Sequence, residues 1–228
     1  MNIYFLVEGK TEAKIYPEWL SHLLPELTKV KYYDLVVKNN YYLFKGNGYP
    51  HIIDVHLPKA IEDVNAVGLY DYIVMSLDAD ESTVSERVAE VNQHVLNLEN
   101  RLTRAKLILI VQNRCIETWL LGNRKIYKHN PQDPTLVQYT KFYNVLLNDP
   151  ELMGKYPGFS EHQQFHKAYF KLLCRERRIN YSERHPRHVI DKSYLDQLLA
   201  RIDDTSHLAT FRHFIDFCRQ IRRHLTKA

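Results

Sequence analysis

Three largely apolar runs constrain the fold of this chain more than any other feature. They cover residues 3–7, 70–77 and 106–111, and segments with helical periodicity separate them. A strand inside a parallel sheet is buried on both faces, so its sequence is a continuous apolar run rather than an alternating one. Strands that alternate with helices form βαβ units with right-handed crossovers. The pattern predicts an α/β fold with a Rossmann-like, mostly parallel sheet flanked by helices.

The segments that follow these runs carry signals for helices. Thr11 can cap a helix that extends to about residue 24. Ser82 can cap an amphipathic helix that extends to about residue 102. A short helix is expected over residues 115–121, after the third apolar run.

The region between the first two apolar runs is less regular. Residues 33–37 and 41–44 are short β-branched or aromatic runs, which predict two strands paired as a hairpin. Residues 52–64 have loosely helical spacing, but Pro58 leaves the start of that helix open.

The charge is uneven along the chain. Residues 1–150 hold 16 Lys and Arg against 18 Asp and Glu, whereas residues 151–228 hold 15 against 9. An acidic first part suits a cation site, and a basic last part suits a polyanion such as nucleic acid. From residue 139 onward the patterns are helical. We therefore expect an α/β domain over residues 1–125 and a helical, basic C-terminal region over residues 126–228, packed on it.

No pattern in the sequence predicts export or membrane insertion. The first apolar run is short and lacks the basic flank of a signal peptide, and no apolar segment approaches the roughly 18 residues that cross a bilayer. Three cysteines, Cys115, Cys174 and Cys218, are odd in number and far apart, so they predict neither a disulfide framework nor a zinc site. We expect a cytoplasmic protein without a membrane partner.

Acidic residues follow two of the apolar runs. Glu8 comes directly after the first, and Asp78 and Asp80 come after the second. Ligands of open parallel sheets bind beyond the carboxyl ends of the strands, which is where these side chains stand. Carboxylates are hard oxygen ligands of the kind that Mg²⁺ takes. Each residue alone has an ordinary alternative, a turn residue for Glu8 and turn or capping chemistry for the aspartates.

Together, the segments FLVEGKTE at residues 5–12 and IVMSLDAD at residues 73–80 resemble the paired signature of the TOPRIM family. That family includes topoisomerases, bacterial primases and OLD-type nucleases, and the likeness covers roughly the first half of the chain. The resemblance implies a TOPRIM-like catalytic domain. In it, Glu8 is a general acid/base or a ligand, while Asp78 and Asp80 bind Mg²⁺ or Mn²⁺.

Two further acidic positions gain roles from the same resemblance. The segment NRCIETWLL at residues 113–121 resembles one in defence-associated TOPRIM proteins of the RloB-like group, which are often encoded beside an ABC-type ATPase that senses infection. Glu117 is then a ligand or a base that orients water, with a first-turn helix glutamate as the alternative. In some OLD-type nucleases a second carboxylate helps to hold a metal, a role that Glu12 would take here. A plain N-terminal helix glutamate is its alternative. Lys10 is placed to bring an ammonium near a phosphate at that helix start.

A basic segment with aromatic neighbours lies in the last third of the chain. Arginine and aromatic side chains together pair with phosphates and stack on unpaired bases, so this segment predicts nucleic-acid binding. A solvated helix face, or salt bridges to the acidic first part, is the alternative. The candidate residues are Lys171, Arg175, Arg177, Arg178, Arg184 and Arg187.

Histidine pairs invite a metal hypothesis that the spacing does not support. His162 and His166 lack the glutamate of a zincin motif, and a proline separates His185 from His188. Both pairs predict surface residues rather than ligands.

Three functions remain open. The first is a Mg²⁺-dependent nuclease acting on DNA or RNA. The resemblance implies that it is the effector of an ATPase-coupled anti-phage defence system, with transfer RNA among its candidate substrates. The second is another enzyme that uses the Asp-x-Asp pair, a phosphatase or a glycosyltransferase, although neither explains Glu8. The third is a non-catalytic regulatory subunit that binds an ABC-type ATPase.

Overall fold

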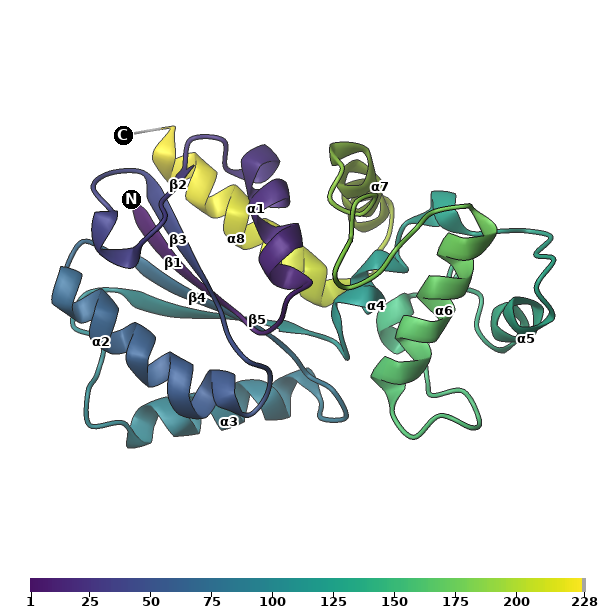
Figure 1. Cartoon of the computed structure of the whole chain (residues 1–228), viewed down its shortest axis with the longest axis horizontal. Coiled ribbons are helices and arrows are strands. Elements are labelled where there is room, and N and C mark those ends of the chain that lie inside the picture. The colour runs from purple at the N-terminus through teal and green to yellow at the C-terminus, as the bar shows by residue number, and fades with distance from the viewer. Residues whose placement is uncertain (227–228) are drawn as a thin grey trace. The chain divides into compact units, whose positions relative to one another are not determined.

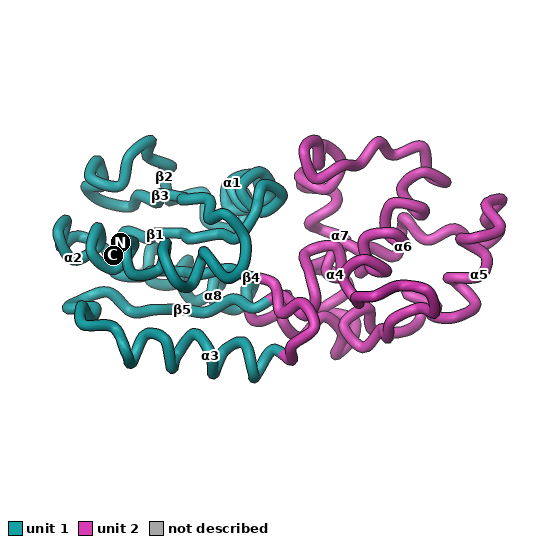
Figure 2. The backbone as a smooth tube through the Cα atoms, turned by 60° about the horizontal axis from the view of Figure 1, so that its bottom comes forward, with its two compact units in different colours: residues 1–77, 84–111, 214–228 teal, residues 78–83, 112–213 magenta. Residues whose placement is uncertain are grey.

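The structure, a computed structural model, describes residues 1–226 and divides into two compact units (Figure 2). The first unit comprises residues 1–77, 84–111 and the chain from residue 214 onward. The second comprises residues 78–83 and 112–213. After the third apolar run the chain enters the second unit at residue 112, and it re-enters the first unit at residue 214, within its last helix.

A five-stranded sheet runs through the first unit, in the order β2-β3-β1-β4-β5 (Figure 1). Its strands are β1 (Asn2–Val7), β2 (Thr28–Lys29), β3 (Asn40–Lys45), β4 (Tyr72–Asp78) and β5 (Lys106–Gln112). The pairs β1/β3, β1/β4 and β2/β3 are parallel. β5 runs the same way, because the Lys106 N–H donates to the Asp71 carbonyl just before β4 and the Ala79 N–H just after β4 donates to the Gln112 carbonyl at the end of β5. The predicted α/β class and parallel sheet are confirmed.

The register of the sheet places strand ends together. Val7 is opposite Lys45 on one side and Ser76 on the other. The Glu8 N–H then donates to the Ser76 carbonyl at 3.0 Å, one residue past the end of β1. The first acidic position therefore stands at the carboxyl edge of the sheet, where the sequence predicted it.

The predicted hairpin at residues 33–37 and 41–44 is wrong. Tyr33–Leu35 is a short 3₁₀ turn, and β3 pairs in parallel with β1 instead of turning back on a neighbour. The reason is a long-range contact, because the Asn2 side chain accepts from the Asn40 N–H and donates to the Val37 carbonyl. This amide fixes the start of β3 beside the start of β1.

Helices cover both faces of this sheet (Figure 1). They are α1 (Glu12–Leu23), α2 (Leu57–Val67), α3 (Val84–Asn97) and the part of α8 (Ala209–Leu225) that begins at Phe214. On one face, Tyr16 of α1 contacts Phe214 at 5.1 Å between ring centroids, and Phe217 contacts Tyr72 of β4 at 5.7 Å. Helices α2 and α3 lie over the other face. The core between these layers is apolar, with Phe5 and Trp19 among its fully buried residues.

Two helix ends differ from the sequence prediction. α1 begins where expected, but Thr11 makes no side-chain capping hydrogen bond. α3 ends at Asn97 rather than near residue 102. The side chain of Asn65 accounts for this, because it accepts from the Thr103 N–H and donates to the Arg101 carbonyl, which holds that segment out of a helix. The open start near Pro58 is settled by a π-helical turn over Ile52–His56 that leads into α2.

The second unit is helical, as predicted for the chain after residue 139. Its helices are α4 (Ile116–Leu120), α5 (Pro134–Phe142), α6 (His162–Glu176) and α7 (Lys192–Asp204). Aromatic rings of α5 and α6 form its core, where Tyr139 contacts Phe165 at 5.0 Å and Tyr169 at 5.8 Å between centroids. Over residues 1–226, the structure contains no helix whose length and apolar character would let it span a bilayer.

Candidate functional site

Two segments that follow strands are tied together at the start of the second unit. The Ala79 N–H donates to the Gln112 carbonyl at 2.9 Å, and the Asp80 N–H donates to the Arg114 carbonyl at 3.1 Å. These bonds continue the ladder between β4 and β5 beyond the body of the sheet. Asp78 and Asp80 are thereby fixed beside the segment that leads into α4.

The backbone is strained at this junction. Asp80 has φ 53° and Arg114 has φ 72°, in the left-handed region that side-chain-bearing residues rarely enter. The Arg114 guanidinium donates to the Asp80 carbonyl at 2.9 Å and to the Ser82 carbonyl at 3.1 Å, which holds both residues in place. Such conformations cost on the order of 1–3 kcal/mol each and collect at functional sites.

Glu117 is the most unusual acidic residue of this region. It lies in α4 and is only 1 % exposed. Its Oε1 accepts from the Tyr181 hydroxyl at 2.9 Å, while its buried Oε2 has no hydrogen-bond partner within residues 1–226. Burying a carboxylate oxygen without a hydrogen-bond donor costs on the order of several kcal/mol, because the oxygen loses its hydration and gains no partner. An atom of this kind suits a cation or a hydrogen-bond donor.

Lys167 of α6 completes the charge pattern, and the sequence did not single it out. Burial by itself lowers the pKa of Lys167, but the negative charges of Glu117 and Asp78 outweigh it and hold the pKa above its ordinary value. The ammonium is therefore protonated among carboxylates. In the sequence, Lys167 resembles any solvent-facing lysine of a helix, so no local signal could have assigned it to the site.

Cys115 lies next to this cluster but is not a nucleophile. Burial, followed by the charges of Glu117 and Asp78, raises the pKa of its thiol well above the ordinary value. The thiolate is the reactive form, so the residue is inert here.

The histidines of α6 were predicted at the surface, and for His166 this is wrong. His166 is fully buried, with its Nε2 at 3.1 Å from the Met153 carbonyl and its Nδ1 at 2.8 Å from the Thr118 hydroxyl. Because a carbonyl only accepts, Nε2 carries the proton and Nδ1 accepts from Thr118. His162 instead pairs with Glu81, whose carboxylate accepts from the His162 N–H at 2.6 Å and lies 2.8 Å from its ring.

The remaining acidic candidates belong to the first unit. The Glu8 carboxylate accepts from the Tyr49 N–H at 3.2 Å, so the loop after β3 orients it. Glu12 is 5 % exposed, and its Oε2 lies 2.8 Å from where a Cβ on Gly9 would be. Any side chain at Gly9 would displace that carboxylate. Lys10, between them, is exposed.

The donor types suit a hard cation, although the described residues hold no ready cluster. Over residues 1–226, no group of three or more His, Cys, Asp or Glu side chains is arranged to hold a metal ion. Mg²⁺ is commonly held by one or two carboxylates, with waters and substrate phosphates as its other ligands. The carboxylate of Asp78 and the orphaned oxygen of Glu117 match that requirement in chemical type.

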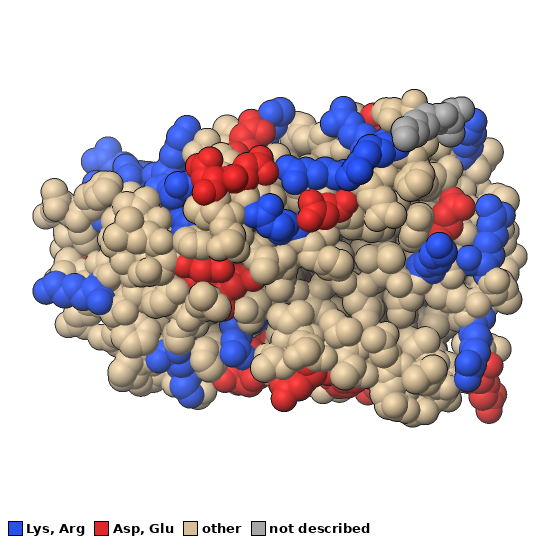
Figure 3. Space-filling view, turned by 180° about the vertical axis from the view of Figure 1, so that it is seen from behind, with Lys and Arg blue, Asp and Glu red and all other residues tan. Residues whose placement is uncertain are grey.

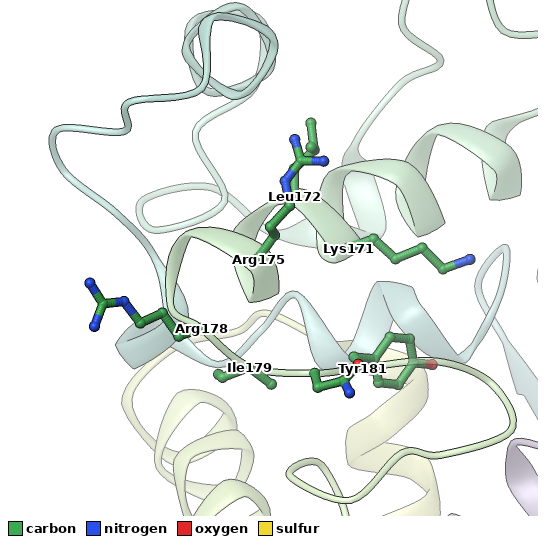
Figure 4. Close-up of a pocket in the computed structure, with 7 residues that line it drawn as sticks. Lys171, Leu172, Arg175, Arg178, Ile179 and Tyr181 are labelled. Atoms are coloured by element: carbon green, nitrogen blue, oxygen red, sulfur yellow. The ribbon is translucent and has the colours of Figure 1, made fainter.

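The basic candidates separate into different roles. Lys171, Arg175 and Arg178 line one pocket at the end of α6 (Figure 4). Arg177 instead donates to the main-chain carbonyls of Ile126 and Tyr127, which is a structural role. Arg184 and Arg187 are exposed and do not line this pocket. On the face of the molecule shown in Figure 3, Lys and Arg are interspersed with Asp and Glu, so that face carries no broad basic area.

Comparisons with known proteins identify no relative. No protein-family model matches the chain, and neither the search of curated proteins nor that of solved structures found a significant match.

Proposed function

We propose that this protein is a divalent-metal-dependent nuclease that hydrolyses phosphodiesters of DNA or RNA. The observation that carries the proposal is the buried Glu117, whose Oε2 has no hydrogen-bond partner within the described chain and whose charge, with that of Asp78, acts on the Lys167 ammonium. Carboxylates and an ammonium past the ends of parallel strands suit a cation together with a phosphate.

The proposed roles follow from the position of each side chain. Asp78 and Glu117 would hold Mg²⁺ or Mn²⁺ together with waters and substrate phosphate. The resemblance to TOPRIM proteins gives a metal-binding role to Asp80, Glu8 and Glu12 as well. The bound cation would polarise the phosphoryl group and activate a water. The Lys167 ammonium neutralises charge on the phosphate, because the carboxylates around it keep it protonated. The Tyr181 hydroxyl fixes the rotamer of Glu117.

The biological setting rests on the resemblance alone. By analogy with defence-associated TOPRIM proteins, the chain would be the effector of an anti-phage system, partnered and controlled by an ABC-type ATPase. Binding of a purified candidate ATPase to this chain, measured by co-purification, tests that part separately.

The test of the nuclease is an assay of the isolated chain with Mg²⁺ or Mn²⁺ on plasmid, single-stranded DNA and total RNA. Asp78→Asn and Glu117→Gln keep shape and remove charge, so each is expected to lower the cleavage rate by at least about 10³-fold. Lys167→Met removes the positive charge that would face the phosphate and is expected to lower the cleavage rate by about 10²-fold.

A matched control is Asp196→Asn, which removes an exposed carboxylate paired with Lys192 on α7 and is expected to leave the rate unchanged. Circular dichroism checks that all variants fold. Cleavage by Asp78→Asn or Glu117→Gln at the parent rate contradicts the proposal. Release of inorganic phosphate from a small ester, without any cutting of nucleic acid, would favour the phosphatase. A folded chain that cuts nothing alone or with its ATPase would favour the regulatory subunit.

A further inference from the structure

A pocket with a volume of about 480 Å³ lies at the C-terminal end of α6, wholly within the second unit. Lys171, Leu172 and Arg175 line it from the helix, and Ile179 and Tyr181 line it from the segment that follows (Figure 4). The lining thus combines cations with aliphatic and aromatic surface. Pockets of about 300–1,000 Å³ are the usual size for small-molecule ligands, so a single nucleotide fits this volume.

Two cations of the pocket, Lys171 and Arg178, are available to an anion. Lys171 is 3.8 Å from Glu183, with both side chains about half exposed, whereas Arg175 pairs with Asp133, whose side chain is only 20 % exposed. An exposed pair such as Lys171–Glu183 contributes only about 0–1 kcal/mol, so a phosphate can replace the Glu183 carboxylate. The Arg178 guanidinium has no ion pair or side-chain hydrogen bond in the described part of the chain. In the view of Figure 4, the Lys171 and Arg178 side chains extend to opposite sides of the pocket.

Tyr181 joins this pocket to the acidic site. Its ring lines the pocket and packs edge-on against Phe170, with 4.7 Å between centroids. Its hydroxyl donates to Glu117 at 2.9 Å. One side chain therefore borders both places, and a ligand against the Tyr181 ring lies within one side chain's length of the carboxylate.

We propose that this pocket binds one unpaired nucleotide of the strand that is cut, next to the phosphate that reacts. The base would lie against Tyr181 with Leu172 and Ile179, and the phosphates would meet Arg178 and Lys171. Bases paired in a duplex are stacked on both sides and cannot enter a pocket, so the substrate is single-stranded or has an unpaired segment. The inference rests on the proposed nuclease activity for its meaning, but the binding itself needs no metal.

The test measures binding without cleavage. A fluorescently labelled oligonucleotide is titrated with the protein in EDTA and followed by anisotropy, using single-stranded RNA, single-stranded DNA and a duplex of the same sequence. Single strands are expected to bind at least about tenfold more tightly than the duplex, since stacking on an aromatic ring is worth about 1–3 kcal/mol per base. The RNA and DNA arms show which backbone is preferred.

Variants separate the base contact from the phosphate contact. Arg178→Ala is expected to raise Kd by about tenfold and to reduce the slope of log Kd against log salt by about 0.7, the contribution of one phosphate contact to a single strand. Tyr181→Phe keeps the ring and is expected to keep affinity, whereas Tyr181→Leu loses about tenfold. Arg223→Ala on α8 removes an exposed arginine that does not line the pocket and is expected to change Kd less than about twofold.

Each outcome bears on one proposal or the other. Equal affinity for duplex and single strand, failure of the parent to bind either, or an unchanged Kd and salt slope in Arg178→Ala overturns the pocket. Competition by an acidic peptide at the same affinity as the oligonucleotide also overturns it. If Arg178→Ala cleaves at the parent rate, the nuclease proposal stands and the pocket proposal is contradicted. If the protein binds single strands tightly but cleaves none of the substrates, the pocket proposal stands and the nuclease proposal is contradicted.

Discussion

The two units of this protein bury polar side chains very differently. With tyrosine counted as apolar, the first unit holds one described polar side chain that is at most 1 % exposed, Ser76. Its hydroxyl is 2.6 Å from that of Tyr16. The second unit holds five such side chains, which are Gln112, Glu117, Thr118, His166 and Arg201.

The difference reflects what holds each unit together. The first unit is specified largely by apolar periodicity and by the main-chain hydrogen bonds of its sheet, although the Asn2 side chain also joins distant segments there. In the second unit, several of the fully buried polar side chains join segments far apart in the sequence. Buried polar groups that are fully satisfied specify a structure strongly, and partly satisfied ones mark places with another task. Glu117 is of the latter kind.

The two tryptophans allow the units to be followed separately. Trp19 lies in the first unit and Trp119 in the second, and both are fully buried. In backgrounds that keep only one of them, fluorescence during urea denaturation reports the unfolding of a single unit. The predictions below are to be measured in this way.

The largest effect is expected from Arg201→Met. The Arg201 guanidinium is fully buried and donates to the main-chain carbonyls of Val145, Leu146 and Asn148. Methionine preserves much of the length but leaves these carbonyls without donors, each at a cost of about 1–3 kcal/mol. We expect the free energy of unfolding reported by Trp119 to fall by about 3–5 kcal/mol. Arg124→Met, which removes a surface partner of Asp204, is the control and should cost less than about 1 kcal/mol.

The strands, and the acidic residues at their carboxyl ends, could be predicted from the sequence. A strand that is buried on both faces has a continuous apolar run, which is visible locally. The runs at residues 3–7, 70–77 and 106–111 all became strands of one parallel sheet. The partner of β3 could not be predicted, because the Asn2 amide selects it across 38 residues.

The candidate site divides in the same way. Positions of Asp78 and Glu117 relative to their strands follow from local sequence. Lys167, and the contact of Tyr181 with Glu117, could not be found. Tyr181 and Glu117 are 64 residues apart, and only the packing of α6 brings Lys167 near. The surface prediction for His166 failed for this reason too, since Thr118 is 48 residues away.

An intermediate effect is expected from His166 as the pH falls. Burial lowers the pKa of His166 to about 3, with the neighbouring charges of His162 and Arg114 acting in the same direction, while the Met153 carbonyl and Glu81 oppose it. The unfolded chain binds this proton near pH 6.5 and the folded chain only near pH 3, so unfolding takes up a proton between these values. Stability from this group is complete above pH 6.5 and is lost as the pH falls toward 3. At pH 5 the loss is about 2 kcal/mol.

The comparison with His166→Gln isolates this contribution from other titrating groups. Glutamine offers a donor and an acceptor but does not titrate, so the Trp119 signal should show a shallower dependence on pH between 6.5 and 4 than the parent. Parallel curves for parent and variant would contradict the lowered pKa, because they would mean that folded His166 binds its proton as readily as His166 in the unfolded chain.

The smallest effect is expected from Leu6→Met in the centre of β1, and it tests the comparison from the opposite side. Leu6 is fully buried, and its strand is held by main-chain bonds that the substitution does not touch. Methionine is close to leucine in volume and adaptable in shape, so the free energy of unfolding reported by Trp19 should fall by less than about 1.5 kcal/mol. The same residue introduced at position 201 is expected to cost at least twice as much, because there it removes donors rather than exchanging one apolar shape for another. Equal costs at positions 6 and 201 would mean that both units are held by packing alone, and that the buried polar side chains of the second unit are incidental to its stability.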